Sequence, residues 1–264
     1  SSEELGRANT ASKLRGETGT KVLVEISSDS GEIREVDLER RSVDLRPVRT
    51  KRLRDDSHTI GYLRITQFSE SVPKKVEEAL QELKEKEVEG LILDLRNNSG
   101  GLVSSGIAVA DSLLSERPVV ETRNRNGIKD AIISQKETSF DGPMVTLVNK
   151  GTASASEILA GSLQDNGRSI LMGEQTYGKG LIQSLKSLGE DSGIAITVAS
   201  YLTPKGNNIQ GQGMTPDKPL DLPEASEYGS ADDKWVRNAE LYLDSLLEKE
   251  EISIQTSELS NAEK

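Results

Sequence analysis

The stretch MVTLVNKGTASASEILAGSL, residues 144–163, decides the fold. Its first five residues are almost wholly apolar, as in a strand buried on both faces. The polar turn NKGT separates this strand from a helical pattern that begins at Ser154, and Asn166 and Gly167 supply the signal that ends the helix. A buried strand joined by a short loop to a helix is the repeating unit of α/β proteins.

A second unit of the same kind precedes the first. The apolar run GLILDLR, residues 90–96, predicts a buried strand, the glycine-containing loop NNSGG follows at 97–101, and a helix is expected from about Ser104 to Leu114. An amphipathic helix is predicted to begin near Pro73, because proline is favoured at the first helical position. Further strands are predicted at 60–65, 169–172 and 195–199. The alternation of strands and helices predicts an α/β core with a mixed sheet between about residues 51 and 220.

The two ends of the chain are more polar than the centre. At the N-terminal end, a strand is predicted over residues 20–26, and partly exposed strands are predicted within 32–54. At the C-terminal end, the spacing of apolar residues from Trp235 to Leu246 predicts one amphipathic helix, and disorder is expected from about residue 248. The sequence therefore divides into residues 1–45, a core at 46–222 and a helix with a tail at 223–264.

Composition narrows the classes of function. The 264 residues include 44 acidic and 33 basic side chains, a net charge of −11, which argues against nucleic acid and anionic membrane surfaces as partners. No apolar run has the about 20 residues that a membrane-spanning helix needs. The absence of cysteine and the presence of only one histidine argue against a metal site. The sequence also contains no phosphate-binding loop that would indicate a nucleotide, so no cofactor is expected.

Ser154 and Lys179 are the candidate catalytic pair. A serine hydroxyl needs a base to remove its proton, and in a chain with one histidine the leading candidate is a lysine. Lys179 lies between two glycines, in a turn expected to hide it from water, and burial favours a neutral amine. Free N–H groups at the predicted helix start, that of Ala155 among them, and at the glycine pair Gly100 and Gly101 could stabilise an oxyanion.

Each of these features also has a simpler interpretation. Taken alone, Ser154 is more often a helix cap, Lys179 a solvated charge, and Gly100 part of a plain turn. His58 is expected at the surface. The remaining candidates are read most simply as follows: Asp165 as a polar residue at a helix end, Gln183 as an ordinary strand position, and Asp94 and Arg96 as residues flanking a strand end.

Four blocks taken together resemble the C-terminal processing peptidases, also called tail-specific proteases, with the CtpA type of cyanobacteria and chloroplasts the most similar. The blocks are LDLRNNSGG at 93–101, VNKGTASASE at 148–157, GEQTYGKG at 173–180, and the segment 202–217, which begins LTP and ends GMTPD. The resemblance implies a crotonase-like or ClpP-like core. It makes Ser154 the nucleophile and Lys179 the general base, with Gln183 orienting the lysine. It places the oxyanion hole at the N–H groups of Gly100 and Ala155, and gives Asp165 a supporting role.

The resemblance also implies a PDZ domain before the core. Residues 11–22 resemble only the final helix, turn and strand of such a domain, so a truncated PDZ remnant is expected within residues 1–45. The implied function is an ATP-independent serine endopeptidase that forms an acyl-enzyme and cleaves near apolar C-termini of proteins. Known members trim the photosystem II reaction-centre precursor in the thylakoid lumen, and bacterial relatives act in the periplasm. The oligomeric state and the physiological substrate stay open.

Two other classes of function fit the same scaffold. A binding module is one, because vertebrate retinoid-binding relatives resemble the peptidase core without being proteases; loss of the serine or the lysine would favour it, and both are present here. A crotonase-like acyl-CoA enzyme is the other. It calls for a basic surface for coenzyme A, which this acidic chain does not offer.

Overall fold

The computed structural model describes residues 10, 12–27, 31–41, 46–54, 58–127, 129–135, 137–189, 192–221, 223, 225 and 227–262. The chain divides into two compact units, Ser1–Leu45 and Arg46–Lys264, each described by itself. Within the described part, no helix combines the length and the apolar character that crossing a membrane would take.

The first unit is built on one β-hairpin. Strands β1 (Lys21–Ser27) and β2 (Ile33–Glu39) pair antiparallel. The Arg40 guanidinium holds a preceding helical turn to this hairpin, since it donates to the Lys13 and Leu14 carbonyls and to the Thr20 hydroxyl. Most of the described side chains of this unit are exposed, as its polar composition predicts.

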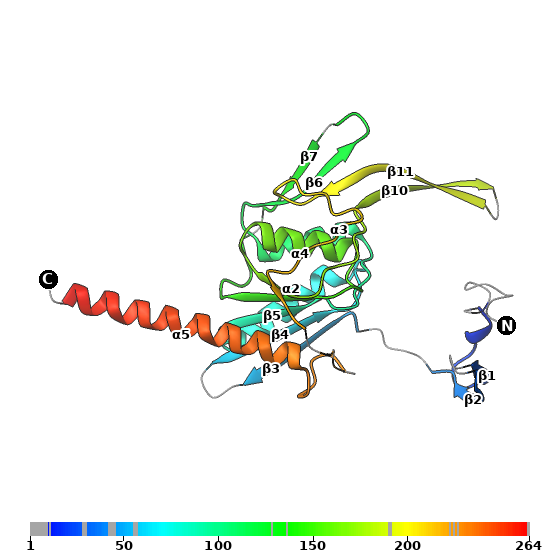
Figure 1. Ribbon diagram of the computed structural model, residues 1–264, viewed down its shortest axis with the longest axis horizontal. Coiled ribbons are helices and arrows are strands. Elements are labelled where there is room, and N and C mark those ends of the chain that lie inside the picture. Colours follow the sequence, from blue (N-terminus) through cyan, green and yellow to red (C-terminus); the bar gives the residue numbers. More distant parts are fainter. Residues whose placement is uncertain are drawn as a thin grey trace. The chain divides into compact units, whose positions relative to one another are not determined.

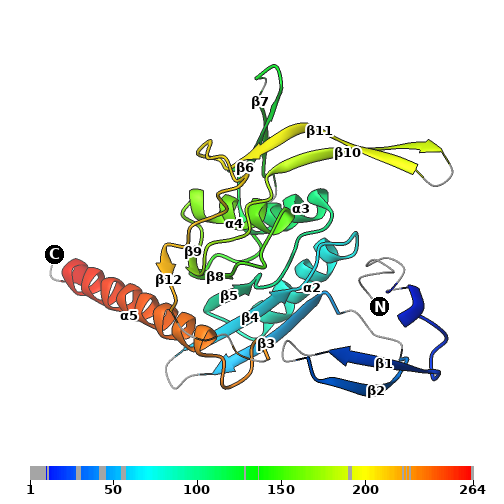
Figure 2. The ribbon, with the colours of Figure 1, turned by 45° about the vertical axis from the view of Figure 1, so that its right-hand side comes forward.

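The centre of the second unit is a six-stranded mixed sheet with the order β12-β9-β8-β5-β4-β3 (Figures 1 and 2). Its strands β4, β5, β8, β9 and β12 run parallel, and β3 pairs antiparallel with β4. The predicted α/β class with a mixed sheet is therefore confirmed. The bounds of the strands are β3 Val48–Arg54, β4 Thr59–Ile65, β5 Gly90–Asp94, β8 Met144–Val148, β9 Ile170–Gly173 and β12 Lys218–Pro219.

Helices pack on both faces of this sheet. Helices α2 (Val72–Glu85), α3 (Val103–Leu113) and α4 (Ala155–Asp165) share one apolar core with the sheet residues Leu91 and Leu93. Ile92, whose side chain points the other way along β5, belongs to a separate core with helix α5 (Lys234–Ala262). Figure 2 shows α5 on the side of the sheet opposite α3 and α4.

A second, four-stranded antiparallel sheet has the order β10-β11-β6-β7. The hairpin of β10 and β11 extends away from the core (Figures 1 and 2). Along this hairpin most side chains are exposed, so the sequence carries little burial pattern, and the strand predicted at 195–199 is only the middle of β11. The bounds are β6 Pro118–Asn124, β7 Lys129–Ile133, β10 Leu181–Gly189 and β11 Ser192–Leu202.

Two expectations about the elements of the second unit and their packing are wrong. Helix α5 continues to Ala262, past residue 248, where disorder was predicted; the extension is rich in glutamate, lysine and other good helix formers. His58, expected at the surface, is only 5% exposed. It is buried because α5 packs over it, and its Nδ1 lies 3.2 Å from Oδ1 of Asp244 on that helix.

Candidate active site

Ser154 has a strained backbone at the junction between β8 and α4. It is the N-cap residue of α4, with φ 58° and ψ −118°, whereas an ordinary N-cap residue adopts the β region. A positive φ costs a residue with a Cβ atom about 1 kcal/mol or more, and such strain is concentrated at functional sites. The conformation of Ser154 therefore favours a functional role over that of a simple cap.

A buried carboxylate, that of Glu157, connects Ser154 to the turn that carries Lys179. Glu157 is completely buried, and its Oε2 accepts hydrogen bonds from the N–H groups of both Ser154 and Lys179, each at 2.8 Å. Its Oε1 accepts from the Gly178 N–H at 2.7 Å and from the Thr176 hydroxyl at 2.5 Å. One anion thus fixes the nucleophile candidate and the base candidate relative to each other.

Sequence reasoning assigned no role to Glu157. The Ser154-x-x-Glu157 spacing of a capping box was a signal that could have drawn attention to it. The hydrogen bonds from the turn at 176–179 could not be foreseen, because they depend on tertiary packing.

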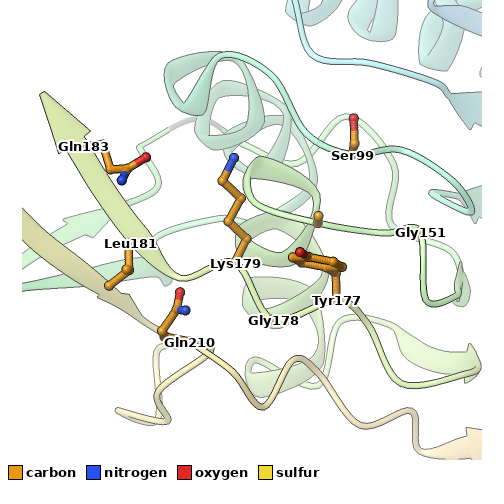
Figure 3. Close-up of a pocket in the computed structure, with 9 residues that line it drawn as sticks. Ser99, Gly151, Tyr177, Gly178, Lys179, Leu181, Gln183 and Gln210 are labelled. Atoms are coloured by element: carbon orange, nitrogen blue, oxygen red, sulfur yellow. The ribbon is translucent and has the colours of Figure 1, made fainter. Parts of the chain in front are cut away.

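A pocket of about 580 Å³ lies beside these loops. Lys179 and Gln183 both line this pocket, as the resemblance requires. Ala153, the residue that precedes Ser154 in the chain, also lines it. Figure 3 shows the Lys179 side chain standing between Gln183 on β10 and Ser99. The complete lining consists of Ser99, Gly151, Ala153, Tyr177, Gly178, Lys179, Leu181, Gln183 and Gln210.

The expected burial of Lys179 is not found, because its side chain is exposed in this structure. The turn is close-packed as predicted, but its backbone makes the packing. Gly178 and Gly180 are buried, and the Gly180 N–H donates to Gln210 Oε1 at 2.9 Å. The lysine side chain leaves this packed turn and enters the open pocket.

Gly100 lies directly against Ser154 and Ala155. Its φ is 101°, and a Cβ atom placed on it would lie 2.8 Å from the Ser154 Cβ and 3.1 Å from the Ala155 nitrogen. Only glycine fits this approach, so the structure brings the two predicted oxyanion donors to one place. The Gly100 N–H is engaged within its own loop, where it donates to Asn98 Oδ1 at 3.0 Å.

Asparagine side chains hold together the β5–α3 loop, residues 95–102, and the β8–α4 loop, residues 149–154. Asn149 Oδ1 accepts from the N–H groups of Asn97 and Gly151 at 2.8 and 3.0 Å. A backbone hydrogen bond adds to these contacts, since the main-chain carbonyl of Asn98 accepts from the Ala153 N–H at 3.0 Å. The two loops therefore form one hydrogen-bonded unit around Gly100.

Asp165 is not brought to this pocket. It is the last of the eleven residues of α4 and therefore lies about 16 Å along the helix from the N-cap residue Ser154. Its Oδ2 accepts the Lys205 N–H at 2.8 Å, so it holds the segment that follows β11.

The profile of "Peptidase family S41" matches residues 59–220, more than half of the chain. The chain belongs to peptidase family S41. Among similar proteins is a carboxyl-terminal-processing protease of Synechocystis sp., 46% identical over 225 residues, which are 84% of this chain and 52% of that protein. The chloroplastic carboxyl-terminal-processing peptidase 3 of Arabidopsis thaliana is 41% identical, over 81% of this chain and 44% of its own length.

A solved structure of a photosystem II D1 C-terminal processing protease has the same fold. Its TM-score is 0.67 at 37% identity, and the match covers 81% of this S41 chain and 59% of that chain. The S41 chain spans about half the length of the curated relatives that it matches. The segment from 221 onward lies outside the family match.

Where β5 passes into the β5–α3 loop, the S41 chain holds a buried network of charges. Arg96, completely buried, donates to both carboxylate oxygens of Asp94 and of Asp233. The Arg64 Nη1 lies 3.0 Å from Asp94 Oδ1 as an ion pair, in a geometry that falls outside that of a hydrogen bond. Asp94 also accepts from the Tyr62 hydroxyl at 2.6 Å. Sequence reasoning did not foresee this network, because Asp233 belongs to the far end of the chain.

The electrostatics of the network favour its charged state. Burial lowers the pKa of Arg96, but hydrogen bonds to Asp94 and Asp233 outweigh this effect and raise the pKa overall. For the acid Asp233 the signs are reversed: burial raises the pKa, but the hydrogen bond from Arg96 outweighs burial and lowers the pKa below its ordinary value. Burial, reinforced by Asp94, raises the pKa of Tyr62 well above its ordinary range. Within the described residues, no group of three or more His, Cys, Asp or Glu side chains is placed to hold a metal ion.

Proposed function

We propose that this chain is the catalytic part of a serine endopeptidase of the C-terminal processing type, with Ser154 as nucleophile and Lys179 as general base. The observation that carries the proposal is the Glu157 carboxylate, which accepts from the backbone of both residues through one oxygen atom. The strained backbone of Ser154 and the contact of Gly100 with Ala155 support the same assignment.

The proposed reaction has two halves. The neutral amine of Lys179 takes the hydroxyl proton of Ser154, and the Ser154 oxygen bonds to the carbonyl carbon of the scissile peptide. The N–H groups of Gly100 and Ala155 stabilise the resulting oxyanion. Lys179 then gives its proton to the departing amine as the C–N bond breaks, and water hydrolyses the acyl-enzyme.

Substrate binding would complete this arrangement. In the free chain, Lys179 is exposed to water and the Gly100 N–H is engaged by Asn98. A polypeptide that fills the pocket would remove the Lys179 amine from water and disfavour its charged form. Its carbonyl oxygen would compete with Asn98 for the Gly100 N–H. Gln183, which lines the same pocket, is proposed to orient the amine.

We propose protein substrates with apolar C-termini. Tyr177 and Leu181 give the pocket apolar surface beside Lys179. One structural relative is named a photosystem II D1 C-terminal processing protease, so a precursor of that kind is a candidate substrate, and the thylakoid lumen or the periplasm is the proposed location. The supporting role proposed for Asp165 is indirect, through the segment that follows β11.

We further propose the finer organisation of the chain. Residues 46–222 are a crotonase-like or ClpP-like core, and residues 223–264 are a C-terminal extension. The β1–β2 hairpin within residues 1–45 is interpreted as the remnant of a PDZ domain, since a helical turn precedes its first strand. Ala11, the first residue of the predicted remnant, lies outside the described residues.

The decisive test uses Ser154→Ala, Lys179→Ala and Lys179→Arg with a peptide that has an apolar C-terminus. All three should lose cleavage, the arginine variant because a guanidinium cannot serve as a neutral base. Lys150→Ala is the matched control: its exposed side chain pairs with Glu174, and it should remain active. Undiminished cleavage by Ser154→Ala or Lys179→Ala would refute the assignment.

A further inference from the structure

We infer that Tyr228, in the segment before α5, is a positioning residue for the β5–α3 loop and hence for the oxyanion donor on Gly100. The inference rests on the proposed function. Tyr228 lies outside residues 59–220, which match the family profile, and is 131 positions from its partner Asn97.

The Tyr228 hydroxyl holds the first turn of that loop. It accepts a hydrogen bond of 2.6 Å from Asn97 Nδ2. Asn97 has a φ of 55°, a left-handed conformation that asparagine tolerates better than most residues but that still needs support. The other end of the Asn97 amide, Oδ1, accepts from Asn149 Nδ2 at 3.0 Å. Tyr228 therefore completes the anchoring of Asn97 between the C-terminal segment and the β8–α4 loop.

The Tyr228 ring is itself held in place by the buried charges. The guanidinium groups of Arg64 and Arg96 lie 4.4 and 4.3 Å from its centroid, within the range of cation–π contacts. Its neighbour Gly229 donates from N–H to Asp233 Oδ2 at 2.8 Å. The hydroxyl is thus presented to Asn97 from a rigid support.

Arg64 also contacts the loop backbone. Its Nη2 donates a hydrogen bond of 3.1 Å to the backbone carbonyl of Arg96, which belongs to the peptide bond between Arg96 and Asn97. From there the loop runs through Asn98 to Gly100, which touches Ser154. A small displacement of Asn97 would therefore move the Gly100 N–H relative to the nucleophile, and displacements of about 1 Å can reduce rates by up to about 100-fold.

The Tyr228 hydroxyl is not needed to attach α5 to the sheet. That attachment is apolar and is made by Trp235, Val236, Ala239 and Leu243 against the β-strands. The hydrogen bond to Asn97 lies at an exposed site and should contribute only about 1 kcal/mol to stability. Removing the hydroxyl should consequently disturb the loop and leave the fold intact.

The test is Tyr228→Phe in the full chain, which keeps the ring on the two arginines and removes only the hydroxyl. Tyr242→Phe, on α5, is the matched control. Amide hydrogen exchange at residues 97–101 should become faster in Tyr228→Phe and stay unchanged in Tyr242→Phe. In peptide cleavage, kcat should fall by about tenfold, with KM and the unfolding temperature nearly unchanged.

Unchanged exchange at residues 97–101, or an unchanged kcat in an active enzyme, would overturn the role of Tyr228. Ser154→Ala measured in parallel separates this failure from that of the proposed function. If Ser154→Ala keeps full activity, the proposed function is wrong. If Ser154→Ala is inactive and Tyr228→Phe behaves like wild type, only the present inference is wrong.

Discussion

The N–H of Ser154 donates a hydrogen bond of 2.8 Å to the carboxylate of Glu157, three residues further along the chain. The acceptor is the same oxygen atom that receives the N–H of Lys179. Replacing a buried anion that accepts four hydrogen bonds should lower the stability of the fold, because each donor left without a partner stays buried and has no hydrogen bond to offset its lost hydration. The geometry of the proposed pair therefore depends on Glu157.

Replacing Glu157 with glutamine should reduce cleavage strongly, with about a 100-fold loss in kcat as a working expectation. The amide keeps one acceptor oxygen but turns an NH2 group toward two of the four donors, so one pair of donors loses its acceptor whichever way the amide is oriented. Thermal unfolding should also shift by the equivalent of about 2 kcal/mol. Glu174→Gln, a partly exposed carboxylate paired with Lys150, is the control. Wild-type kinetics for Glu157→Gln would contradict the coupling.

Alanine at Gly100 should abolish most of the activity. Its methyl group would lie 2.8 Å from both the Ala153 carbonyl oxygen and the Ser154 Cβ, so the β8–α4 loop must move. Gly127→Ala is a matched control, since Gly127 also has a positive φ, 76°, but open space around its Cβ position. The control should lose only about 1 kcal/mol of stability to backbone strain, with kcat unchanged. Equal activities of the two variants would argue against a precise fit at Gly100.

Asp165→Ala should act mainly on stability. The substitution removes the acceptor of the Lys205 N–H and should cost about 1 kcal/mol, measured by denaturant unfolding. Because Asp165 lies at the far end of α4 from Ser154, kcat should fall less than in Glu157→Gln. Asp165→Asn retains an acceptor oxygen and should lie between wild type and alanine. An Asp165→Ala variant that is fully stable but inactive would instead indicate a direct catalytic role.

The stabilising effect of Asp233 should depend on pH. Its pKa in the folded chain is below the ordinary value of 3.8, because the hydrogen bond from Arg96 outweighs the effect of burial. The unfolded state therefore binds this proton more readily, so the contribution is complete above about pH 4 and is lost as pH falls through the folded pKa. The difference in free energy of unfolding between wild type and Asp233→Asn should shrink from pH 5 to pH 2.5. A difference that stays constant over that range would contradict the shift.

Local sequence patterns sufficed for the elements that carry the proposed chemistry. The apolar run at 144–148 is β8 residue for residue, and the helix expected from Ser154 is α4 with Ser154 as its cap. These predictions succeeded because a strand buried on both faces and a capped helix leave patterns within about ten residues. The β10–β11 hairpin left only a partial pattern, the strand predicted at 195–199, since its side chains are mostly exposed.

The sequence by itself determined which residues could react: a serine at a helix start, a lysine between glycines, and a glycine loop that leaves N–H groups accessible. Only the tertiary structure decided how they are held. Glu157 receives donors about twenty residues away, and Arg96 is paired with a carboxylate 137 residues away. The exposure of Lys179 was likewise decided by which atoms pack against its turn. Such long-range contacts follow from the folding of distant segments onto one sheet, and no local pattern encodes them.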